Sequence, residues 1–240
     1  MSGEKVDTAH VKALAHSRSG TVIYLLSAGV ERHVVYPGAN MAANPSDLPE
    51  VLISSSDIVI ASLTVQQTII EELFAKAKKA GAKTILNPFP ENELSRRVLE
   101  LSDYLILNEV ELAYRSGDKE LAMSHHKDMR MTPEMILQKA KKVRARNDQV
   151  IVTTLADRGA IGTIGEKQTA VAGIKVKFAD ATGAGDCFLG SFAAALSEGK
   201  DFKRALEFAN CAAAISVQTI GTTTSFPKRK DVDELAKKQK

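Results

Sequence analysis

The chain has 240 residues, of which 44% are hydrophobic and 25% are charged. This length and apolar content can bury one good core, so we expect a single domain over residues 1–240. The 32 basic and 29 acidic residues leave a net charge of +3, which is too close to balance to indicate a nucleic-acid partner. We interpret the basic residues near the C-terminus, at 228–230 and 237–240, as a solvated helix face.

Three features bear on the cellular compartment. The first ten residues are polar and contain no apolar segment of a secretory signal. No run of roughly 18 apolar residues occurs, so we expect no membrane span. Cys187 and Cys211 lie in apolar runs, where buried free thiols are the default in a reducing compartment. These features predict a cytoplasmic protein without a membrane partner.

Two β-strands are predicted near the start of the chain, at 21–26 and 32–36. Ser27-Ala28-Gly29 between them supplies turn residues, so the two strands are expected to pair as a hairpin. A hairpin on its own has unpaired strand edges unless another chain covers them.

From residue 46 onward the chain alternates between apolar strand segments and segments of helical spacing, beginning with a short helix. We expect strands at 57–61, 83–86, 103–107 and 149–154, and helices at 66–80, 94–101 and 132–146. Gly81 is a signal for the end of the first of these helices, and Thr132-Pro133 opens the last one. This alternation indicates an α/β fold whose parallel sheet has helices on both faces.

Polar motifs begin directly after three of these strands, at Asn87, Asn108 and Thr154. In open α/β sheets, ligands bind at the carboxyl ends of the strands. The three motifs are therefore predicted to share one ligand-binding rim.

The stretch Asp180-Ala181-Thr182-Gly183-Ala184-Gly185-Asp186 precedes an Ala-rich apolar run of helical character. Small residues at a helix N-terminus let an oxyanion approach free backbone N–H groups. Asp186, in the first turn, is well placed to take a proton from an attacking hydroxyl. The same pattern also fits an ordinary N-cap followed by an aspartate that stabilises the helix dipole.

Taken in order, these motifs resemble those of the ribokinase family of carbohydrate kinases, the PfkB-type sugar and nucleoside kinases. Residues 180–186 are similar to the family signature Asp-Thr-Thr-Gly-Ala-Gly-Asp, with Ala181 as the departure. Residues 108–111 match its Asn-x-x-Glu motif, and 87–90 are similar to its Asn-Pro-Ala-Pro turn. Residues 154–159 resemble its Thr-x-Gly-x-x-Gly nucleotide loop, with Ala156 in place of the first glycine.

The resemblance implies a ribokinase-like three-layer α/β sandwich with a mostly parallel sheet and a partial β-lid. The hairpin at 20–37 would be a remnant of that lid. Val6–Val11 is similar to a segment that normally lies well inside the fold, and the family's opening strand and Gly-Gly-x-x-x-Asn segment are not found. We therefore expect residues 1–240 to form an N-terminally incomplete member of the family.

The activity implied is ATP-dependent phosphorylation of a sugar hydroxyl, most simply of ribose to ribose 5-phosphate. Asp186 would be the base, and the N–H groups of Gly183, Ala184 and Gly185 would stabilise charge on the transferring phosphoryl group. Three lid residues would face the sugar, although plain strand packing explains them equally well: Val22, Tyr24 and Val35.

The resemblance also assigns residues to the nucleotide and to two metal ions. The nucleotide would contact Asn108, Thr154, Arg158, Gly159 and Asn210, although Arg158 also fits a solvated side chain. Glu111 would hold Mg²⁺ through water, with a surface helix glutamate as the alternative. Residues matching the family's K⁺ site are Asp180, Thr182, Ser216, Gly221 and Ser225. Asp180 also fits a turn residue that bonds its own backbone.

The acceptor side leaves a second interpretation open. Ser62-Leu63-Thr64 stands where relatives close to ribokinase often have Gln-x-Glu, and a hydroxyl cannot replace a carboxylate that accepts two hydrogen bonds. The alternative is a weak or inactive relative that binds nucleotide but lacks the sugar site. A homodimer through the lid edge would cover the unpaired strands.

Overall fold

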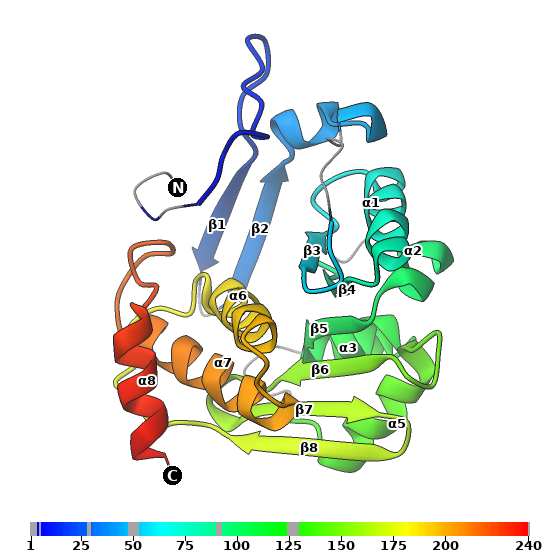
Figure 1. Cartoon of the computed structure of the whole chain (residues 1–240). Coiled ribbons are helices and arrows are strands. Elements are labelled where there is room, and N and C mark those ends of the chain that lie inside the picture. Colours follow the sequence, from blue (N-terminus) through cyan, green and yellow to red (C-terminus); the bar gives the residue numbers. More distant parts are fainter. Residues whose placement is uncertain are drawn as a thin grey trace.

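The computed structural model describes residues 4, 6–27, 30–47, 53–89, 93–123 and 130–239. Its largest element is a six-stranded sheet with the order β3-β4-β5-β6-β7-β8 (Figure 1). The strands β3 to β6 are parallel to one another, whereas β7 and β8 are antiparallel. Their bounds are β3 Ile58–Ser62, β4 Lys83–Asn87, β5 Tyr104–Asn108, β6 Val150–Thr154, β7 Gly159–Ile164 and β8 Lys167–Ala172.

Helices cover both faces of this sheet, and the strands, helices and sheet order confirm the predicted α/β sandwich. The helices are α1 Gln67–Ala80, α2 Arg96–Leu101, α3 Glu109–Arg115, α4 Lys119–Met123, α5 Pro133–Val143, α6 Ala184–Ser197, α7 Phe202–Ser216 and α8 Arg229–Lys238. Gly81 ends α1 with φ +79°, as its position predicts, and the Thr132 hydroxyl caps α5 by accepting from Met135 N–H.

The alternation of side chains along the central strands divides the core into two layers. On β5, Ile106 faces the cluster formed with α6 and α7, whereas Leu105 and Leu107 face the cluster formed with α3 and α5. Successive residues of a strand point to opposite faces, so one apolar strand supplies both layers. A third cluster joins α1 and α2 to β4.

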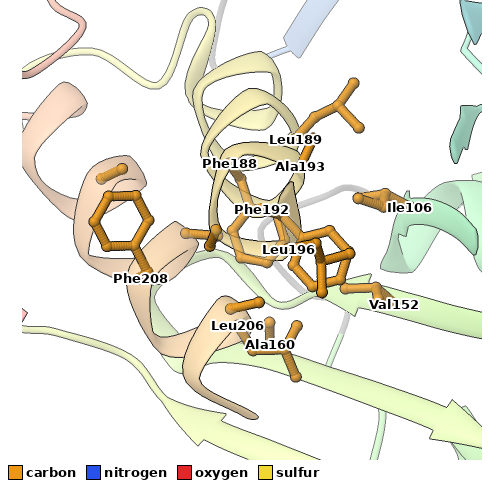
Figure 2. Close-up of a cluster of buried hydrophobic side chains, with 14 of the residues drawn as sticks. Ile106, Val152, Ala160, Phe188, Leu189, Phe192, Ala193, Leu196, Leu206 and Phe208 are labelled. Carbon is orange, nitrogen blue, oxygen red and sulfur yellow. The ribbon is translucent and has the colours of Figure 1, made fainter. Parts of the chain in front are cut away.

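Helix α6 is fixed by the most aromatic part of the core. Phe192 is fully buried, and its ring makes edge contacts with Tyr104 at 5.7 Å and Phe202 at 6.0 Å. Figure 2 shows Phe188, Phe192 and Leu196 of α6 among side chains from the sheet and from α7. Burying one such phenyl ring contributes about 2–3 kcal/mol. This anchoring holds the N-terminus of α6 at the rim of the sheet.

A two-stranded antiparallel sheet stands apart from the main one and matches the predicted hairpin (Figure 1). Its strands are β1 Thr21–Ser27 and β2 Val30–Tyr36, with Val22 opposite Val35. The turn residues Ala28 and Gly29 lie outside the described residues. About half of the surface of several apolar side chains is exposed here: Ile23, Leu25, Val34, Val35 and Tyr36.

Three local expectations differ from the structure. The hairpin β7–β8 was not expected, and it closes the sheet with an antiparallel edge. Helix α5 ends at Val143, before the predicted end at Arg146. The predicted short helix after residue 46 is a three-residue 3-10 turn, Pro45–Asp47, and residues 48–52 lie outside the described part.

The predictions for the two cysteines and for the basic C-terminal residues are confirmed. Cys187 and Cys211 are buried free thiols, and burial raises the pKa of Cys211 to about 11. Of the basic C-terminal residues, Lys228 is the N-cap residue of α8, those at 229–230 and 237–238 lie on the helix, and all of these are exposed; Lys240 lies outside the described residues. Among the described helices, none has both the length and the apolar character that crossing a bilayer requires.

Candidate functional site

The carboxyl ends of the parallel strands form the predicted rim. Asn87 lies beside Ser62 in the β3–β4 pair, and Asn108 lies beside Thr154 in the β5–β6 pair. The Asn87 amide donates to the Ile106 carbonyl at 3.0 Å, which ties the ends of β4 and β5 together. Three of the sequence motifs therefore begin on adjacent strands of one sheet edge. Pro90, the last residue of the turn that begins at Asn87, lies outside the described residues.

Asn108 and Glu111 form a reciprocal cap at the start of α3. Asn108 Oδ1 accepts from the Glu111 N–H at 2.8 Å, and the Asn108 N–H donates to Glu111 Oε2 at 2.8 Å. Glu111 is only 5% exposed, so the interpretation as a surface glutamate is wrong. A carboxylate at a helix N-terminus is stabilised by the helix dipole, which offsets part of the cost of burial.

Glu109 is a second buried carboxylate on the same helix, and it was not identified from the sequence. The residue is 9% exposed, and Oε1 accepts from the Met131 N–H at 2.7 Å and from the Arg158 guanidinium. Arg158 Nη1 also donates to the Met131 carbonyl at 3.1 Å. The side chain of Arg158, predicted either to reach a phosphate or to be solvated, is 27% exposed and makes an ion pair with Glu109 in this structure.

The nucleotide-loop motif forms a tight turn between β6 and β7. Ala156 has φ +52°, and it is the one non-glycine residue with positive φ in the described part of the chain. Gly159 has φ +98°, and a Cβ added there would lie 2.1 Å from the Val171 carbonyl oxygen. The loop is therefore packed against β8 so closely that only glycine fits at its end.

The Gly-rich motif forms the start of α6. Gly183 is the N-cap residue, with φ +82°. The Ala184 N–H donates to the Ala181 carbonyl at 3.0 Å, whereas no acceptor in the described part of the chain is recorded for the N–H groups of Gly183 and Gly185. A Cβ added at Gly185 would meet no atom within 4 Å. The space above Gly185 is therefore open for a ligand.

Asp186 lies in the first turn of α6, beside those two amides. The residue is exposed at the rim, yet the protein around its carboxyl group removes enough water to raise its pKa above the usual value. A raised pKa makes the carboxylate a stronger base.

The residues matching a K⁺ site lie on two linked loops and at the end of α7, where Ser216 is the last helical residue. Asp180 Oδ1 accepts from the Thr182 N–H and hydroxyl at 2.9 and 2.7 Å, and Oδ2 accepts from the Gly221 N–H at 3.0 Å. The hydrogen bond from the Gly221 N–H has the largest effect, and together with the two donors of Thr182 it holds the pKa of Asp180 below its usual value. Asp180 therefore bonds the backbone of its own turn, which is the alternative role predicted from the sequence. The hydroxyls of Ser216 and Ser225, both buried, donate to nearby backbone carbonyls.

Asn210 lines a cavity of about 740 Å³ between β8, α7 and α8. Its amide nitrogen donates to the Ala172 carbonyl at 2.8 Å. Its lining combines apolar residues with two carboxylates, Glu207 and Asp233, and four cationic side chains: Lys200, Lys203, Arg204 and Lys237. The residues that line it do not include Asp186 or the glycines before it.

The remaining predicted residues lie on the lid and after β3. Val22 and Val35 are opposite each other on β1 and β2 and are 40% and 47% exposed. Tyr24 pairs with His33 in the same register. The hydroxyls of Ser62 and Thr64 are 2.8 Å apart and form a polar pair at the end of β3.

Comparison with known proteins identifies relatives over nearly the whole chain. The family model described as pfkB family carbohydrate kinase matches residues 1–229. The ribokinase of Staphylococcus aureus is 29% identical over 96% of this chain and 74% of its own length. The ribokinase of Haemophilus influenzae is 30% identical over 97% and 74%. The structure of Arabidopsis thaliana ribokinase complexed with ribose and ATP has a TM-score of 0.75 and 29% identity, covering 92% of this chain and 70% of that one.

The backbone of Ala156 generates a stability prediction. A left-handed conformation costs an alanine about 1–2 kcal/mol, whereas glycine adopts it freely but adds entropy to the unfolded chain. We expect Ala156→Gly to raise the free energy of unfolding by about 0.5–1 kcal/mol, measured by urea denaturation. Ala43, with φ −68°, is the control: Ala43→Gly should lower it. If both variants lost the same free energy of unfolding, the assignment of backbone strain to Ala156 would be contradicted.

Proposed function

The chain belongs to the pfkB family of carbohydrate kinases, and from this premise we propose that it transfers the γ-phosphoryl group of ATP to a hydroxyl of ribose. The observation that carries the proposal is the start of α6. There the open space over Gly185, the amides of Gly183 and Gly185, and the Asp186 carboxylate come together. Phosphoryl transfer to an alcohol needs hydrogen-bond donors for the phosphoryl oxygens and a base beside them.

In the proposed reaction, Asp186 accepts the proton of the attacking sugar hydroxyl. The oxygen forms a bond to the γ-phosphorus as the bond to the bridging oxygen of ATP breaks, and ADP leaves with that oxygen. The N–H groups of Gly183 and Gly185 donate to the charge that builds up on the transferring group. The N–H of Ala184 would join them only if it left the Ala181 carbonyl.

The nucleotide would lie along the rim from the start of α6 toward Asn210. Asn108, Thr154 and Gly159 are the residues proposed to line its phosphates and ribose. Thr154 and Asn108 end adjacent strands, which supports a shared ligand. The base would occupy the end of the cavity at Asn210, whose volume exceeds that of an adenine ring.

Two metal ions are part of the proposal. A bound Mg²⁺ would neutralise phosphate charge. Glu111 fits as a partner of the ion through water, because the Asn108 N–H holds one oxygen of the Glu111 carboxylate and so fixes the position of the group. Asp180, Thr182, Ser216, Gly221 and Ser225 are proposed for K⁺. Their hydroxyl and carbonyl oxygens suit a monovalent cation. The described residues contain no group of three or more His, Cys, Asp or Glu side chains arranged as a metal site, so side-chain ligation by such residues is not part of the proposal.

Ribose as the acceptor is supported by the ribokinases to which the chain is similar. Val22, Tyr24 and Val35 are proposed to cover the sugar from the lid. Ser62 and Thr64 would contribute hydroxyls from the end of β3, where a carboxylate would bind the sugar more strongly. Sugar affinity is therefore the weakest part of the expected activity, and nucleotide binding without turnover is the second candidate function.

Replacing the proposed base tests the reaction. Asp186→Asn should lower the rate of ribose-dependent ADP release by roughly 10²–10⁴-fold, because an amide cannot accept the proton. In the unmodified chain the rate should fall as the pH drops through the raised pKa of Asp186, since only the carboxylate is a base. ADP release with Mg-ATP and K⁺, compared across ribose, fructose and adenosine, measures both effects.

The matched control is Asp231→Asn, which removes an exposed carboxylate from the first turn of α8 and should leave turnover unchanged. If Asp186→Asn turns over ribose as fast as the unmodified chain, Asp186 is not the base. If no acceptor gives turnover but Mg-ATP raises the melting temperature, the nucleotide-binding function is the correct one.

We also propose that two copies of the chain pair through the lid. Ile23 and Val34 are opposite each other on β1 and β2 and are 53% and 51% exposed, a larger apolar surface than an isolated two-stranded sheet carries stably. Sedimentation equilibrium should give a dimer for the unmodified chain and a monomer for Ile23→Lys with Val34→Lys. Met41→Lys, an exposed apolar residue outside both strands, should remain dimeric. A monomeric unmodified chain would refute the pairing.

A further inference from the structure

We propose that Glu109 and Arg158 form a latch that holds the nucleotide loop, residues 154–159, against the start of α3. The inference rests on the proposed function, because it assigns a positioning role within the proposed nucleotide site. It concerns two residues whose side chains point at each other rather than at the open rim.

The latch is a closed ring of three contacts. Arg158 donates to Glu109 Oε1 and to the Met131 carbonyl, and the Met131 N–H donates to the same Glu109 oxygen. Met131 is 2% exposed and lies directly before the N-cap residue of α5. The ring therefore joins the loop, α3 and the start of α5 through groups largely withdrawn from water.

Backbone hydrogen bonds close the loop on itself: the Leu155 N–H donates to the Gly159 carbonyl at 2.8 Å, and the Arg158 N–H donates to the Leu155 carbonyl at 3.0 Å. The latch adds a charged side-chain tie from this loop to other elements. Thr154 is held beside Asn108 by the β5–β6 register, and Gly159 is held against Val171 by close packing. Between them, Ala156 is exposed and has a positive φ, which an alanine leaves readily if nothing opposes it. Arg158 is the residue of this segment whose side chain reaches another element with charged hydrogen bonds.

The consequence is a fixed distance between two halves of the nucleotide site. Glu109 is the neighbour of Asn108 and lies one turn or less from Glu111, the residues proposed near the phosphates and Mg²⁺. Arg158 is the neighbour of Gly159 at the other half. A ligand that contacts both halves binds more tightly when their spacing is set in advance. Loss of the latch should therefore weaken nucleotide binding more than it slows the chemical step.

A direct contact between Arg158 and a phosphate is the competing role, and it predicts the opposite response to one substitution. Glu109→Gln removes the negative charge that holds Arg158. A latch would loosen, and nucleotide affinity would fall. A phosphate-binding arginine would be released toward the ligand, and affinity would stay the same or rise.

The experiment titrates Mg-ATP into the full chain by calorimetry, without sugar, for Glu109→Gln, Arg158→Gln and the double variant. We expect each single variant to bind about tenfold more weakly and the double variant to bind no more weakly than the singles, because the two residues act as one unit. With ribose, the KM for ATP should rise by a similar factor while kcat and the KM for ribose stay within about twofold of the unmodified chain.

Lys139→Gln is the matched control. It removes a buried cation that pairs with Asp118 at 2.6 Å on the same side of the sheet, outside the loop. It should lower the melting temperature without changing Mg-ATP affinity, as a purely structural loss would. Arg158→Lys keeps the charge but not the forked geometry, so its affinity should lie between those of the unmodified chain and Arg158→Gln.

Two results would overturn the latch: unchanged affinity in both single variants, or weakened binding in Arg158→Gln with none in Glu109→Gln. If Glu109→Gln does not fold, the Arg158→Lys and Arg158→Gln pair decides, because equal loss in both contradicts a charge-based latch. An unmodified chain that does not bind Mg-ATP removes the proposed nucleotide site itself, and the latch with it. That outcome is seen in the first titration, before any variant is compared.

Discussion

The structure of the rim depends on two buried carboxylates at the start of α3, whose charges must be compensated by hydrogen-bond donors or a cation. A carboxylate is stable in a protein interior only where donors or a cation replace its lost hydration. Glu111 is compensated by the Asn108 N–H, and Glu109 by the Met131 N–H and Arg158. These donors belong to the end of β5, the start of α5 and the nucleotide loop. Satisfying the two charges therefore fixes three segments of the rim relative to one another.

The other half of the site is fixed by apolar packing instead. Phe192 anchors α6 in the core between β5 and α7, and this packing holds the helix whose first turn lies at the sheet edge (Figure 2). Gly185 leaves open space over that turn, and Asp186 gains a raised pKa from the protein around it. A rigid helix end with free N–H groups is an arrangement that can hold a phosphate group.

Much of this arrangement follows from local sequence signals. The apolar strands, the cap of α5 and the motifs at the strand ends are set by patterns that act over a few residues, and they were predicted correctly. The β7–β8 hairpin was missed because β7 contains Gly162, whose missing side chain makes room for the Phe202 ring of α7. The ion pair between Glu109 and Arg158 was missed because its partners are far apart in the chain, and only the folded sheet edge brings them together.

The central claim is that one nucleotide bridges the start of α3, the nucleotide loop and the start of α6. Amide hydrogen exchange of the full chain, with and without Mg-ATP, tests it most directly, because it reports each segment separately. The predicted result is slower exchange in residues 108–111, 154–159 and 183–186 together, with β1 and β2 unchanged. Protection confined to the wall of the cavity near Lys203 and Lys237, with the three rim segments unchanged, would contradict it.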